Sequence, residues 1–126
     1  MSNQSLNPPQ KQLNTKYELV TGKAVSNGEL INPMLAGYAY NYEGESHYVL
    51  RLSMFPKSFY YLIKNKDSAT SYTVFSRRLV DPGDPTKIWF QNPVGSGQVT
   101  EELKSHLELR FPLIGVPIFM SLFPAV

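Results

Sequence analysis

The stretch that decides the fold is residues 34–55, MLAGYAYNYEGESHYVLRLSMF. Its first half alternates tyrosine with other residue types, which is the two-residue side-chain period of a β-strand. The EGES segment at residues 43–46 has turn chemistry. After it, the apolar positions again fall on every second residue: Tyr48, Leu50, Leu52 and Met54. The stretch is therefore predicted to be a β-hairpin.

The length of the turn predicts how the two strands of this hairpin pair. A two-residue or a four-residue loop places Tyr42 opposite His47 and Tyr38 opposite Arg51. The apolar side of the return strand, including Met54, should then face the core, and the tyrosine row should face outward. A three-residue loop would move every side chain to the other face.

The rest of the chain is predicted to consist of short strands and turns. Alternation or β-branched and aromatic content predicts strands at residues 16–25, 29–32, 71–79, 87–91, 106–111 and 116–123. Residues 58–64 fit a strand or one helical turn, and a helical turn capped by Thr100 fits residues 100–107. Residues 81–85 and 92–97 are rich in Pro and Gly and are predicted to be loops. These elements suit an all-β domain, either a small barrel or a half-closed antiparallel sheet, with at most one short helix.

Length and composition indicate a single folded domain. The chain has 126 residues, of which 42% are hydrophobic and 17% charged, and this is enough to build one modest core. Residues 1–15 lack a periodic apolar face and are predicted to be a flexible N-terminal arm. Residues 16–126 are predicted to form one β-rich domain.

The residue inventory argues against several classes of function. Cysteine is absent, which excludes disulfides, thiol catalysis and thiolate metal sites. The two histidines, His47 and His106, are expected at the solvated surface, and no carboxylate pattern accompanies them. We therefore expect no catalytic residue, no metal, no cofactor and no enzymatic activity. No apolar run reaches the roughly 20 residues of a membrane helix, and the polar start lacks a secretory signal, so we expect a cytoplasmic protein without a membrane partner.

The remaining chemistry is that of surface recognition. Single-stranded nucleic acid offers base faces to aromatic rings and phosphates to Lys and Arg. The net charge is only +2, so clustering matters more than the sum. The candidate nucleic-acid-binding residues are Tyr38, Tyr40, Tyr42, Arg51, Lys57, Lys64, Lys66, Arg77 and Trp89. The alternative is that the tyrosines pack beneath another element or in a protein interface.

The segments YAYNY (residues 38–42), HYVLRLSMF (residues 47–55) and SYTVFSRR (residues 71–78) carry a resemblance at the level of architecture. The chain resembles an OB-fold, and is similar to the small single-stranded DNA-binding proteins of phages and plasmids. This resemblance implies an OB-like barrel whose second and third strands present the binding face.

The leading prediction is thus a non-enzymatic protein that binds single-stranded nucleic acid, more readily DNA than RNA. The alternative is a protein–protein interaction or assembly module of a phage or mobile element. A homo-oligomer, such as a dimer, is expected in either case, because exposed strand edges favour pairing.

Overall fold

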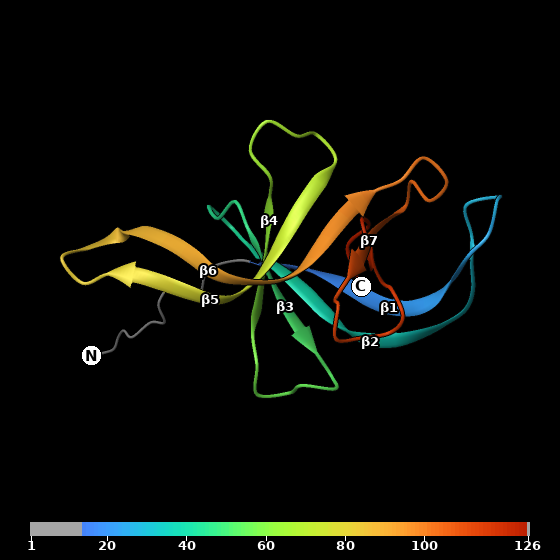
Figure 1. Cartoon of the computed structure of the whole chain (residues 1–126), viewed down its shortest axis with the longest axis horizontal. Coiled ribbons are helices and arrows are strands. Elements are labelled where there is room, and N and C mark those ends of the chain that lie inside the picture. The colour runs from blue at the N-terminus through green and yellow to red at the C-terminus, as the bar shows by residue number, and fades with distance from the viewer. Residues whose placement is uncertain (1–13, 126) are drawn as a thin grey trace, which may run out of the picture.

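The computed structural model describes residues 14–125 and shows a closed barrel of antiparallel β-strands (Figure 1). The strands are β1 (Asn14–Ala24), β2 (Leu30–Tyr42), β3 (Tyr48–Leu52), β4 (Tyr60–Lys64), β5 (Ser71–Asp81), β6 (Asp84–Val99), β7 (His106–Arg110) and β8 (Ile118–Ser121). The described residues contain no helix, and hence none that could cross a membrane. The predicted all-β class and the small barrel are confirmed.

The strands follow one another around the barrel in sequence order, and β8 closes it by pairing with β1. An OB-fold instead has five strands in Greek-key order. The likeness to an OB-fold therefore lies in the class, a small antiparallel barrel, and not in the strand order.

The hairpin of β2 and β3 has the predicted register. Tyr38 lies opposite Arg51, and Tyr40 lies opposite Val49. Leu50 has no exposed surface, so this side of the hairpin faces the core as predicted. Met54 is the exception, because β3 ends at Leu52 and leaves Met54 in the following loop, 64% exposed.

The core consists of side chains that point into the barrel at every second position of each strand. Its largest fully buried members are Leu19, Leu50, Leu62, Leu107, Leu109, Met120 and Val74. Leu103, between β6 and β7, is buried in a second, smaller cluster with Val20 and Phe119. Four tyrosines pack partly buried against the core: Tyr17, Tyr48, Tyr60 and Tyr72. Tyrosine therefore occupies both sides of this barrel wall.

Gly37 allows β2 to lie close against β3. A Cβ atom at this position would lie 2.0 Å from the backbone oxygen of Arg51, which no side chain tolerates. The missing side chain lets the two strands approach closely, just before the tyrosines that follow on β2.

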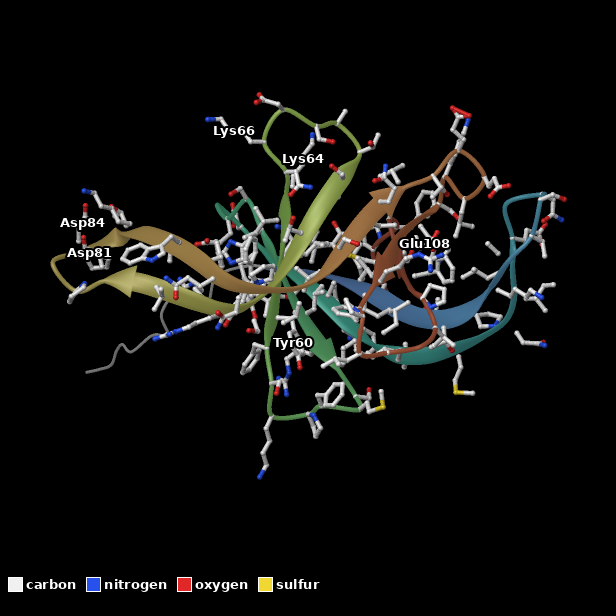
Figure 2. All side chains as sticks on the ribbon, in the orientation of Figure 1. Tyr60, Lys64, Lys66, Asp81, Asp84 and Glu108 are labelled. Carbon is white, nitrogen blue, oxygen red and sulfur yellow. The ribbon has the colours of Figure 1, made fainter. Side chains whose placement is uncertain are left out.

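β5 and β6 continue beyond the barrel as a two-stranded arm, residues 77–91. β4 pairs with β5 only as far as Phe75, and β7 pairs with β6 only from Ser96 onward. Figure 1 shows the arm leaving the barrel in yellow and orange, and Figure 2 labels Asp81 and Asp84 at its tip.

The predicted loop at residues 92–97 is wrong, because β6 runs through it. The register shifts opposite Val74 and Phe75, and a bulge of this kind accommodates an extra residue without ending the strand. Gly95 faces Phe111, where a Cβ would lie only 2.7 Å from the ring. This glycine thus serves close packing in the barrel rather than a loop.

Two further segments differ in detail from the predictions. Residues 100–105 form turns without a helix, in which the Thr100 hydroxyl accepts a hydrogen bond from the Leu103 amide at 3.2 Å. The strand predicted from His106 follows as β7. At the other end, β1 begins at Asn14, two residues inside the predicted arm. The rest of that arm, residues 1–13, lies outside the described residues.

Candidate functional site

The outward side of β2, β3 and β4 forms one continuous aromatic surface. Ala39 and its partner Leu50 on β3 are buried and point inward. Tyr38 and Tyr40 flank Ala39 on β2, so they point outward. Val49 pairs with Tyr61, which extends the surface onto β4. We call this surface the outer face; it extends onto β1, and its residues are Lys16, Glu18, Tyr38, Tyr40, Tyr42, Val49, Arg51, Phe59 and Tyr61. Its three β2 tyrosines are half-buried, so each ring keeps part of its surface open to solvent.

Two cations lie over aromatic rings of the outer face. The Nζ atom of Lys16 is 4.6 Å from the centre of the Tyr38 ring, and the guanidinium carbon of Arg51 is 4.6 Å from the centre of the Phe59 ring. The Arg51 Nη2 group also donates a hydrogen bond to the Pro56 carbonyl at 2.9 Å. Such cation–π contacts hold the charge beside the ring. An anion or an aromatic ligand would therefore meet both groups together.

A hollow lies between Tyr38, Tyr40 and Arg51. Its lining is completed by Gly37, Leu52, Ser53 and Pro56. The rings of Tyr38 and Tyr40 are 6.4 Å apart, centre to centre, with a tilt of 44°. The two rings thus form adjacent platforms along β2, with the guanidinium on the neighbouring strand.

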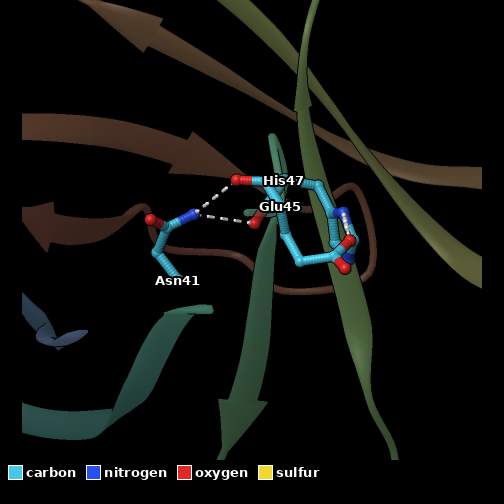
Figure 3. Close-up of polar contacts among 3 residues, drawn as sticks. All are labelled: Asn41, Glu45 and His47. Atoms are coloured by element: carbon cyan, nitrogen blue, oxygen red, sulfur yellow. Dashed lines mark hydrogen bonds and ion pairs between the residues drawn. The ribbon is translucent and has the colours of Figure 1, made fainter. Parts of the chain in front are cut away.

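A second hollow, which we call the His47 cavity, lies at the other end of the tyrosine row. It has a volume of about 290 Å³ and is lined by Tyr42, Glu45, His47, Val49, Phe59, Tyr61 and Arg78. The β2–β3 turn supplies two of these groups. Figure 3 shows how the turn is held: the Asn41 side-chain amide donates to the backbone oxygens of Glu45 and His47, at 3.4 and 3.1 Å.

His47 is buried, with only 5% of its surface exposed, so its predicted place at the solvated surface is wrong. The Phe90 ring at 5.0 Å and the Tyr61 ring at 6.2 Å, centre to centre, exclude water from the imidazole. This burial lowers the pKa of His47; the Glu45 carboxylate raises it and the Arg78 guanidinium lowers it further. The Nδ1 atom lies 3.6 Å from the Glu45 Oε1 atom. The imidazole is consequently neutral at pH 7.

His106 is half-buried, so it reaches the solvated surface only in part. Its Nδ1 atom lies 2.8 Å from the Ser105 hydroxyl, and burial lowers its pKa. It lies on β7 and does not line the His47 cavity.

The predicted binding residues fall into two groups. The structure brings Tyr38, Tyr40, Tyr42 and Arg51 together on the outer face. The other five are exposed but lie elsewhere. Lys64 and Lys66 lie at the end of β4 and in the next turn (Figure 2). Lys57 lies in the β3–β4 loop, and Arg77 and Trp89 lie on the arm. Trp89 lies opposite Leu79 and is 43% exposed.

Several residues of this site are not among the nine candidate residues named from the sequence. Lys16 and Phe59 make the cation–π contacts, Tyr61 joins the outer face, and Arg78, rather than Arg77, lines the His47 cavity. The alternation of residues 58–64 carried a signal for Phe59 and Tyr61. The Arg77–Arg78 pair indicated one arginine on each face of the strand. Which of the two reaches the site depends on how the base of the arm packs against β3 and β4.

Among residues 14–125, no three His, Asp or Glu side chains gather in a way that could hold a metal ion. The sequence matches no protein-family profile, no curated protein and no solved structure.

Proposed function

We propose that this protein binds single-stranded nucleic acid, with DNA as the first ligand, on the outer face and without catalysing a reaction. One observation carries the proposal: Tyr38, Tyr40 and Tyr42 stand on the outside of the barrel with Lys16 and Arg51 beside them. If these three tyrosine rings filled the barrel interior, no base could stack on them and the proposal would have no support.

Two physical contributions support this ligand. Bases stack on exposed aromatic rings with about 1–3 kcal/mol each, and the row offers several rings in succession. Phosphates are neutralised by cations that release bound counterions. Lys16, Arg51 and Arg78 lie beside the aromatic groups, and three phosphate contacts give a slope of about −2 for log K against log salt on a single strand.

The direct test is a titration of the Tyr and Trp fluorescence with oligo-dT at several salt concentrations. We expect quenching at low salt and an affinity that falls with a log–log slope of about −2. An unchanged fluorescence at low salt, or an affinity that does not depend on salt, contradicts the proposal.

The second candidate is a protein–protein module that pairs with another copy of the chain, and the arm favours it. A two-stranded ribbon is only marginally stable in water. This one has unpaired outer edges and exposed apolar side chains at Val80 and Trp89.

Light scattering on the intact chain tests this candidate. A concentration-dependent dimer is expected, and it should be lost when residues 79–89 are replaced by an Asn-Gly turn that joins the paired residues Arg78 and Phe90. A monomer at all concentrations rules the candidate out.

A further inference from the structure

The His47 cavity continues the tyrosine row but differs from it in chemistry. Tyr42 ends the row and also lines the cavity, and Phe59 and Tyr61 supply further aromatic walls. Its volume of about 290 Å³ is near the lower end for small-molecule sites. A strand lying along Tyr38 and Tyr40 would therefore reach the cavity at its next positions.

The polar groups of the cavity are of two opposite kinds. The Glu45 carboxylate only accepts hydrogen bonds, and the Arg78 guanidinium only donates them. Both groups line the cavity together with His47, and the Glu45 carboxylate oxygen lies 3.6 Å from the His47 Nδ1 atom. The Glu45 side chain is 30% exposed, and a carboxylate has about four lone-pair sites, so it can accept hydrogen bonds from a ligand in the cavity as well as contact His47.

We propose that the His47 cavity takes up one base of the bound strand and selects guanine. This inference rests on the proposed function. The Watson–Crick edge of guanine presents two adjacent N–H donors, N1–H and N2–H, which match the two oxygens of a carboxylate. Its O6 and N7 atoms are acceptors that match a guanidinium.

The other bases fit this pair of groups less well. Adenine and cytosine each offer a single exocyclic amino donor, and thymine presents the O4 acceptor and a methyl group. None of them presents two adjacent donors to Glu45 together with two acceptors to Arg78. The aromatic walls stack with any base, so the discrimination comes from the two charged groups.

The first experiment compares oligo-dT with the same strand carrying one central guanosine, adenosine or cytidine. We expect the guanosine strand to bind about tenfold more tightly than oligo-dT, since a bidentate contact discriminates by about 1.4 kcal/mol or more. The adenosine and cytidine strands should bind as oligo-dT does. Equal affinity for all four strands overturns the inference.

A pair of matched variants locates the preference. In Glu45→Gln an amide donor replaces one acceptor, so the ratio of the affinity for the guanosine strand to the affinity for oligo-dT should fall to about one. Glu43→Gln removes the same charge from the same turn, at a side chain that does not line the cavity, and should keep the preference. A preference that survives Glu45→Gln contradicts the assignment.

Titration with guanosine monophosphate separates this inference from the proposed function. We follow the imidazole signals of His47 by NMR and expect them to shift with the guanine nucleotide but not with thymidine monophosphate. If oligo-dT fails to bind but the guanine nucleotide shifts His47, the proposed function falls and the cavity assignment stands. If oligo-dT binds and His47 does not respond, only the cavity assignment falls.

Discussion

Tyr38 and Tyr48 show that residue type alone does not decide the role of a tyrosine in this barrel. Tyr38 stands outward beneath Lys16, whereas Tyr48 packs against the core, its ring 5.7 Å from that of Tyr17. Alternation along each strand separates the two roles. A change of one outward tyrosine should therefore affect ligand binding far more than folding.

The first prediction concerns Tyr40, which stands in the middle of the row. Tyr40→Ala removes one stacking platform, and the affinity for oligo-dT should fall by about 5- to 100-fold. Tyr40→Phe keeps the ring and should bind nearly as the original chain does. The measurement is the fluorescence titration, with thermal unfolding as the check that both variants fold. An alanine variant with unchanged affinity would show that the row does not contact the strand.

The second prediction concerns Lys16, whose ammonium lies over the Tyr38 ring. Lys16→Gln should make the slope of log K against log salt shallower by about 0.7, because one phosphate contact is lost. The control is Lys23→Gln, a change at an exposed position near the far end of β1, which should leave the slope unchanged. Equal slopes for both variants would place the phosphates away from Lys16.

The third prediction is a loss of stability on acidification, due to His47. Burial lowers its pKa in the folded state below the ordinary value of 6.5, so the unfolded chain binds more protons in the interval between the two values. The free energy of unfolding should be greatest above about pH 6.5 and fall as the pH drops toward the folded-state pKa. His106 acts in the same direction.

Two measurements check this sign. The NMR titration midpoint of the His47 imidazole should lie below 6.5. Urea unfolding should give a lower free energy of unfolding at about pH 5.5 than at about pH 7.5. In His106→Asn part of this pH-dependent difference should remain, because His47 still contributes to it. A His47 midpoint above 6.5, or greater stability in acid, contradicts the account.

At the scale of elements, the β2–β3 hairpin could be predicted down to its register. Its turn length and its alternation of apolar side chains are both local features of the sequence, and they agree. The strand β6 was predicted only in part, at residues 87–91, because Pro93 and Gly95 suggest a loop when they are considered locally. Gly95 is required by the approach of Phe111 from another part of the chain, which no local pattern shows.

The fourth prediction concerns the crossing of β2 and β3 at Gly37. Gly37→Ala places a methyl group 2.0 Å from the Arg51 carbonyl oxygen, so the two strands must move apart. A loss of roughly 2–4 kcal/mol in the free energy of unfolding is expected, as for other severe steric changes. Gly115→Ala, where the added Cβ meets nothing within 4 Å, is the control and should be nearly neutral. Urea unfolding compares the two, and equal stabilities would contradict the packing described.

At the scale of the whole molecule, the sequence predicted the class of the fold but left open whether the sheet closes into a barrel or stays half-closed. Short alternating strands indicate a small β domain wherever they pair. The pairing of β1 with β8 joins segments about one hundred residues apart, and no local signal reports it. The candidate site divides in the same way: Tyr38 and Arg51 follow from one hairpin, whereas Arg78 reaches the His47 cavity only through tertiary packing.

The most direct test of the central claim is a backbone amide NMR spectrum recorded during titration with oligo-dT. If the outer face binds the strand, the largest shifts should fall on Tyr38, Tyr40, Arg51 and Tyr61. The apolar end of the barrel around Phe55, Leu113 and Ile114 should remain unchanged. Shifts confined to that end or to the tip of the arm, with the tyrosine row unaffected, would contradict the claim that the outer face binds single-stranded nucleic acid.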